Sequence, residues 1–127
     1  MQLRVARHTH NIKKLTQFYV LVFNFEVLGN FENHNNYNGV FLGKKRQSWH
    51  IEFTESLEKV NPIFNEDNLW VFYPKTQQEY NIIINTIKQN QIPIHQAKNP
   101  YWNNNGMLIK DPDGYGIIIS PLKIEDL

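Results

Sequence analysis

The stretch DPDGYGIIIS, residues 111–120, joins a compact turn to an uninterrupted apolar run, and no other segment of the chain is as informative about structure. Pro112 presets a turn angle, the Asp113 side chain can bond its own backbone, and Gly114 tolerates positive φ. The run from Tyr115 to Ser120 has the residue types of a buried strand. We therefore expect a turn that leads directly into the last strand.

The residues before this turn predict the other elements of the second half. Leu69 to Tyr73 is an aromatic and β-branched run typical of a strand. Thr76 and Glu79 have the spacing of a capping box, so we expect a helix with an apolar face of Tyr80, Ile83, Ile84 and Ile87. Pro93 blocks the continuation of this helix, and extended segments are expected at Pro93 to Ala97 and Met107 to Lys110.

The first half has a similar order of elements. Leu3 to Thr9 alternates as a strand does, and Asn11 can cap a helix with Ile12, Leu15, Phe18, Tyr19 and Val22 on its apolar face. Three short strands are expected at Phe25 to Phe31, Tyr37 to Leu42 and Trp49 to Thr54. The sequence thus predicts an α+β domain of two βαβββ modules, about 1–55 and 66–122. Their helices would cover one sheet face, and the other face would line a cavity.

Composition limits the classes of function. The chain has 127 residues, 13 Lys and Arg against 12 Asp and Glu, and no cysteine. These values fit one domain and exclude disulfides, thiolate metal sites and cysteine nucleophiles. The net charge of +1 gives little reason to expect nucleic acid or a membrane as a partner. This small charge instead favours a small-molecule or protein partner. The charged N-terminus has no apolar leader, so we expect a cytoplasmic protein.

Two motifs carry a resemblance to a known superfamily. The segment RVARHTHNIKKLTQFY, residues 4–19, and the late DPDGYGIIIS are similar to the opening and closing signatures of the vicinal oxygen chelate (VOC) superfamily. Glyoxalase I, extradiol dioxygenases, fosfomycin-resistance transferases and bleomycin-resistance proteins share that fold. The resemblance covers nearly the whole chain, 1–127 as a single domain. It implies a curved mixed sheet around a cavity and a homodimer.

The resemblance also implies where a metal ion would be held, with one ligand on each of four strands. The first position falls on Arg4, whose guanidinium has no lone pair to offer a metal. The second falls on Glu52, a residue that could serve. The third falls near Asn68 or Leu69, and the last on Ile118. We therefore expect no cofactor and a metal-free cavity. The remaining alternative is a divalent metal held by His8, His50 and Glu52 in another geometry.

An arginine in place of a metal ligand suggests a replacement for the ion. A carboxylate in an apolar pocket is costly unless it is paired, so we expect an ion pair between Arg4 and Glu52. His8 falls at a cavity-facing position in the superfamily and is a candidate for binding or acid–base chemistry, or is a structural histidine. His50 has the same two interpretations, while Trp49, Ile51 and Phe53 are expected in the core.

The segment KNPYWNNNG, residues 98–106, resembles a cavity-bordering connection of metal-free VOC proteins. Tyr101 and Trp102 could stack on a planar ligand, or Trp102 could anchor the loop on the core or at a dimer interface.

Three functions follow as hypotheses. The first is a metal-independent small-molecule-binding protein of the glyoxalase/bleomycin-resistance type, with Arg4, His8, Tyr101 and Trp102 binding the ligand. The second is a glyoxalase-like lyase or isomerase with Glu52 or His50 as catalytic base. The third is an interaction module with a vestigial cavity.

Overall fold

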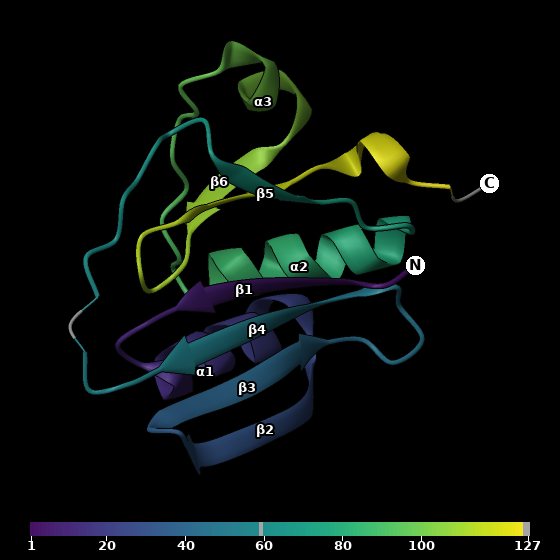
Figure 1. Cartoon of the computed structure of the whole chain (residues 1–127). Coiled ribbons are helices and arrows are strands. Elements are labelled where there is room, and N and C mark those ends of the chain that lie inside the picture. The colour runs from purple at the N-terminus through teal and green to yellow at the C-terminus, as the bar shows by residue number, and fades with distance from the viewer. Residues whose placement is uncertain (59, 126–127) are drawn as a thin grey trace. The chain divides into compact units, whose positions relative to one another are not determined.

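The computed structural model describes residues 1–58 and 60–125, which form two compact units, Met1–Pro62 and Ile63–Leu127 (Figure 1). Each unit combines a small sheet with helices. The α+β class and the two repeated modules predicted from the sequence are confirmed. No helix among the described residues has the length and apolar character needed to cross a bilayer.

The first unit has the predicted βαβββ order. Its sheet has the strand order β1-β4-β3-β2, in which β1 pairs parallel to β4 and the other neighbours are antiparallel. The β2–β3 hairpin turns at Asn35 and Asn36, which both have positive φ, as a two-residue hairpin turn often requires. The elements are β1 (Leu3–His8), α1 (Ile12–Phe23), β2 (Glu26–His34), β3 (Tyr37–Gly43) and β4 (Trp49–Glu55).

Helix α1 supplies much of the first unit's core. The Asn11 side chain accepts a hydrogen bond from the Lys14 amide at its N-terminus, as expected for a cap. Tyr19, on the buried face of the helix, lies 5.3 Å from the ring of Phe53 on β4. Ile51 is buried like Phe53, whereas Trp49 is only partly buried. The opposite face of the sheet therefore carries the alternate residues of β1 and β4.

The second unit has a smaller sheet, with the strand order β5-β7-β6. Strands β5 and β7 are parallel, and β6 and β7 form the hairpin that the DPDG turn closes. Thr76 accepts a hydrogen bond from the Glu79 amide and caps α2. The elements are β5 (Leu69–Phe72), α2 (Gln77–Gln89), α3 (Pro100–Asn105), β6 (Met107–Lys110), β7 (Gly116–Ile119) and the 3-10 turn η1 (Pro121–Lys123).

Two expectations for the second unit are wrong. Residues 93–97 form no strand and make a single bridge, between His95 and Leu108. The reason lies in the side chain of Asn103, which accepts from the Ala97 amide and donates to the Ala97 carbonyl, so both backbone groups are already bonded. In addition, part of the 98–106 segment is the helix α3 rather than a loop. The second module therefore has three strands instead of four.

Candidate functional site

The sheet face opposite α1 gathers the polar candidates of the first unit. Parallel pairing of β1 and β4 sets Arg4 opposite His50 and Ala6 opposite Glu52, while antiparallel pairing sets Phe41 of β3 opposite Glu52. Residues opposite each other in a sheet share a face, so these side chains are neighbours. The register thus brings Arg4, near the start of the chain, together with Phe41, His50 and Glu52.

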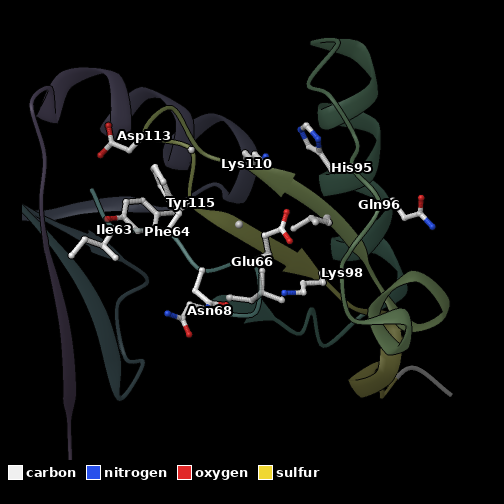
Figure 2. Close-up of a pocket in the computed structure, with 15 residues that line it drawn as sticks. Ile63, Phe64, Glu66, Asn68, His95, Gln96, Lys98, Lys110, Asp113 and Tyr115 are labelled. Atoms are coloured by element: carbon white, nitrogen blue, oxygen red, sulfur yellow. The ribbon is translucent and has the colours of Figure 1, made fainter. Parts of the chain in front are cut away.

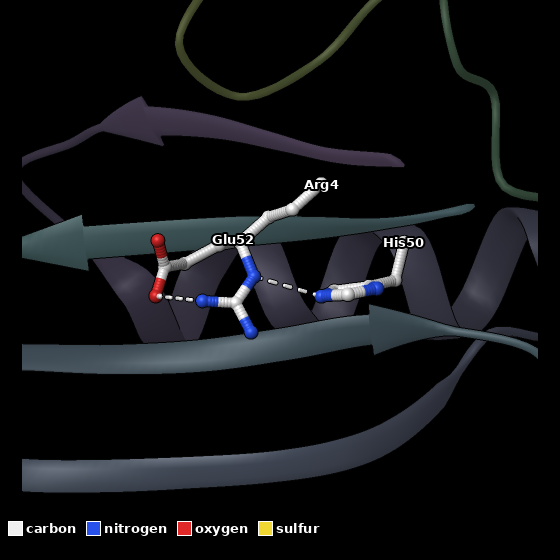
Figure 3. A network of polar contacts seen from close by, with 3 residues as sticks. All are labelled: Arg4, His50 and Glu52. Atoms are coloured by element: carbon white, nitrogen blue, oxygen red, sulfur yellow. Dashed lines mark hydrogen bonds and ion pairs between the residues drawn. The ribbon is translucent and has the colours of Figure 1, made fainter. Parts of the chain in front are cut away.

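Arg4 is the centre of this group (Figure 3). Its Nε donates a 2.9 Å hydrogen bond to His50 Nε2, and its Nη1 lies 3.8 Å from Glu52 Oε2. The guanidinium carbon lies 4.4 Å from the centroid of the Phe41 ring, a cation–π arrangement. The ion pair expected between Arg4 and Glu52 is confirmed. The Arg4 side chain is 50% exposed and that of Glu52 14%.

The hydrogen bond from Arg4 fixes the proton on His50. Because a guanidinium is always protonated and only donates, His50 Nε2 must supply the lone pair, and Nδ1 carries the proton of the neutral ring. The ring of Phe41 approaches His50 edge-on, with 6.0 Å between the ring centroids. In this arrangement Nε2 of His50 is already engaged and is not available as a base.

The residues at the four metal positions do not fit a VOC-type metal site. Arg4 has no donor lone pair. Ile118 is fully buried in an apolar cluster with Ala97 and Leu108, against which Leu69 packs. Within residues 1–58 and 60–125, no three His, Asp or Glu side chains are grouped so that they could hold a metal ion. Glu52 is therefore the one carboxylate left from the superfamily's ligand set.

His8 lies on the same sheet face with different partners. Its Nδ1 is 2.7 Å from Thr54 Oγ1 and its Nε2 is 3.1 Å from Ser56 Oγ, while Tyr37 packs edge-on against the ring. Both nitrogens are thus bonded to hydroxyl groups. The sequence interpretation missed Thr54 and Ser56, although the strand period that places Glu52 on this face also places Thr54 there.

Tyr101 and Trp102 belong to α3 in the second unit. Their rings meet edge-on with centroids 4.9 Å apart. Trp102 packs against the apolar cluster of Ala97, Leu108 and Ile118, which matches the anchoring role that was one of its two interpretations. Tyr101 is 51% exposed. The two aromatics therefore differ: Trp102 is partly buried against the core cluster, and Tyr101 is exposed on the surface.

The second unit also contains a pocket of about 600 Å³ (Figure 2). Its wall comes from three separate segments, residues 63–69, 95–98 and 108–116. None of the six predicted site residues lines it. The signal that could have located it is the DPDG turn, because Asp113, Gly114 and Tyr115 form part of its wall.

The fold agrees with comparisons to known proteins. A crystal structure of a YycE protein of unknown function from Bacillus subtilis matches with a TM-score of 0.84 and 31% identity, over 99% of this chain and 91% of that chain. Glyoxalase I of Leishmania major, described as trypanothione-dependent, matches with a TM-score of 0.72 and 18% identity, over 94% and 85%. The fosfomycin resistance protein FosX of Listeria monocytogenes matches with a TM-score of 0.70 and 13% identity, over 94% of this chain and 91% of that chain. These neighbours define the class as the VOC superfamily.

The sequence narrows this class to one family. Residues 3–54 match the YycE-like N-terminal domain and residues 67–120 the YycE-like C-terminal domain. The uncharacterized protein YycE of Bacillus subtilis (strain 168) is 34% identical over 118 residues, 92% of this chain and 85% of that protein. The chain belongs to the YycE-like family.

Proposed function

We propose that this chain is a metal-independent small-molecule-binding protein of the glyoxalase/bleomycin-resistance type, with Arg4, His50 and Glu52 as its polar anchor. The observation that carries the proposal is the bonding of the Arg4 guanidinium to both His50 and Glu52. The arginine provides, as a fixed part of the protein, the positive charge that a metal ion would otherwise bring beside this carboxylate. Phe41 provides an aromatic surface beneath it.

The anchor can accept either sign of ligand charge. The contact between Arg4 and Glu52 is long, at 3.8 Å, so an anionic ligand group could replace the carboxylate on Nη1 at small cost. A cationic group would instead be attracted to Glu52, whose side chain is mostly buried. An acceptor atom elsewhere on either ligand could receive a hydrogen bond from His50 Nδ1, which the bond from Arg4 to Nε2 leaves protonated in the neutral ring.

Calorimetric titration with fosfomycin, an anion, and metal-free bleomycin, a cation, tests the proposal. We expect one of the two to bind in the presence of EDTA. If it is fosfomycin, it should bind about tenfold more weakly to Arg4→Met, and if it is bleomycin, about tenfold more weakly to Glu52→Gln. Lys45→Met, in an exposed turn, is the matched control and should bind as the unmodified protein does. Absence of binding by both probes, or binding that needs added Mn²⁺, would contradict the proposal.

The enzyme hypothesis is narrowed to Glu52 by the geometry around His50. The lone pair of His50 Nε2 is engaged by Arg4, whereas the Glu52 carboxylate faces Arg4 Nη1 with Oε2 at 3.8 Å. A lyase or isomerase would thus use Glu52 as its base. Turnover of methylglyoxal with glutathione that is lost in Glu52→Gln would favour this alternative. We expect no turnover, with or without added zinc or nickel.

The interaction module with a vestigial cavity stays an alternative, because the open pocket of about 600 Å³ lies in the second unit and none of the six predicted site residues lines it. The expected homodimer and the expected cytoplasmic location stay predictions. Light scattering coupled to size-exclusion chromatography would test the first, and a mass of twice 15.1 kDa is the expected result.

A further inference from the structure

The pocket of the second unit has an apolar floor built by the three-stranded sheet. One face of that sheet carries Leu69, Leu108 and Gly116. Leu69 and Lys110 both pair with Gly116, and Leu108 shares a face with Lys110 because it lies two residues earlier on the same strand. A Cβ atom on Gly116 would lie 2.6 Å from a methyl group of Leu69 and 3.3 Å from one of Leu108. The two leucines therefore close over the glycine and form a continuous floor.

One end of the pocket combines a carboxylate with two aromatic rings (Figure 2). Buried Asp111 accepts hydrogen bonds from the amides of Asp113 and Tyr115, which fixes the turn that carries both side chains. The Tyr115 ring lies 4.9 Å from that of Phe64, and Figure 2 shows Asp113 at the same end. A carboxylate beside aromatic faces is a favourable environment for an organic ammonium group.

The other end of the pocket carries positive charge. Figure 2 shows Lys98 on the side opposite Asp113, with Lys110 and Glu66 between them. Among the residues that the structure describes, neither lysine forms an ion pair with a carboxylate. Away from Asp113, the pocket wall thus carries the two ammonium groups of Lys98 and Lys110 and the one carboxylate of Glu66, an excess of one positive charge. A carboxylate or phosphate group on a ligand would compensate it.

We propose that this pocket binds a zwitterionic organic molecule, with its ammonium group at Asp113, Phe64 and Tyr115 and its anionic group at Lys98 and Lys110. An apolar chain between the two groups would lie on the floor of Leu69, Leu108 and Gly116. A ligand with one charge would leave the opposite end uncompensated, so both charges are needed for full affinity. The proposal is independent of the function proposed above, because the two sites share no residue.

The test uses probes that differ only in charge. The zwitterion 6-aminohexanoate is compared with hexanoate and hexylammonium by ¹H–¹⁵N NMR titration of the full chain. We expect the zwitterion to bind about tenfold more tightly than either singly charged probe. Its shifts should map to the amides of residues 108–116. Equal binding of all probes, or shifts elsewhere in the chain, would overturn the proposal.

Charge-removing variants assign the two ends. The Asp113→Asn variant should no longer bind 6-aminohexanoate more tightly than hexanoate. The double variant Lys98→Met, Lys110→Met should no longer bind 6-aminohexanoate more tightly than hexylammonium. Asp113→Asn is isosteric and leaves the backbone bonds to Asp111 in place, so the fold is preserved. Lys88→Met, on the exposed face of α2, is the matched control and should bind the zwitterion normally. A variant at either end that keeps the full preference would contradict the assignment of that end.

Discussion

Arg4 meets three side chains with three different parts of one guanidinium group. Nε donates to His50, Nη1 faces Glu52, and the planar face lies on Phe41. The pairing with Glu52 could be predicted from strand parity and from the cost of an unpaired carboxylate. The bond to His50 could not, because it depends on β1 and β4 being directly paired and parallel, which no local pattern in the sequence specifies.

The free energy of the Arg4–Glu52 interaction should be small. A double-mutant cycle with Arg4→Met and Glu52→Gln, measured by urea unfolding, should give a coupling of about 0.5 kcal/mol. The physical reason is the 3.8 Å separation and the half-exposed arginine, which solvent screens. A coupling above about 2 kcal/mol would mean that the pair is mainly a stabilising device rather than an exchangeable anchor.

Asp111 should contribute more to stability than the residues of the anchor. Its side chain oxygen accepts from two backbone amides while the residue is only 4% exposed. We expect Asp111→Ala to lower the free energy of unfolding by about 2 kcal/mol, since two partly buried amides lose their partner. Asp111→Asn keeps an acceptor oxygen and should cost less. If both variants unfold at the same urea concentration as the unmodified protein, these bonds do not hold the turn.

Most elements were predictable where their residues form an unbroken pattern. The strands of the first unit and the helices α1 and α2 follow from alternation, apolar spacing and caps. Helix α3 was missed because its residues, PYWNNN, have low intrinsic helix propensity. Its stability comes from packing of Trp102 on the apolar cluster and from an Asn99 side chain that caps its first turn.

The cap of α2 provides a test at the level of one helix. Thr76 Oγ1 accepts from the Glu79 amide at 3.0 Å. Thr76→Ala should lower the unfolding free energy by about 1 kcal/mol, whereas Thr76→Ser keeps the hydroxyl and should change it little. Urea unfolding followed by circular dichroism measures both. Equal losses in the two variants would show that the threonine methyl, and not the cap, is responsible.

The junction between α3 and β6 is sterically tight. A Cβ on Gly106 would lie 2.5 Å from Ile118 Cγ2 and 3.1 Å from the Ile119 carbonyl oxygen. Gly106→Ala should therefore destabilise the protein by about 1–3 kcal/mol, measured by thermal unfolding. Gly43→Ala, whose Cβ would meet its neighbours at 3.4 Å, is the matched control and should change stability by less than about 1 kcal/mol. A neutral Gly106→Ala would contradict this packing.

For the chain as a whole, the sequence predicted two modules, but it did not predict that the second sheet has three strands and the first has four. The second module keeps three strands because Asn103 bonds both backbone groups of Ala97. Its pocket was also missed, because the wall is assembled from three segments that lie apart in the sequence, residues 63–69, 95–98 and 108–116, and the DPDG turn in the last of them does not by itself indicate the other two. The superfamily's metal positions, by contrast, could be evaluated from the sequence, because they depend only on residue identity.

We infer that a protein-borne cation, Arg4, takes the place of a metal ion beside Glu52. Equilibrium dialysis of protein purified without chelator against Zn²⁺, Ni²⁺ and Mn²⁺, followed by elemental analysis, tests this inference. We expect no stoichiometric metal, because Arg4 and Ile118 offer no ligand atoms. One bound equivalent per chain that is lost in Glu52→Gln would contradict it.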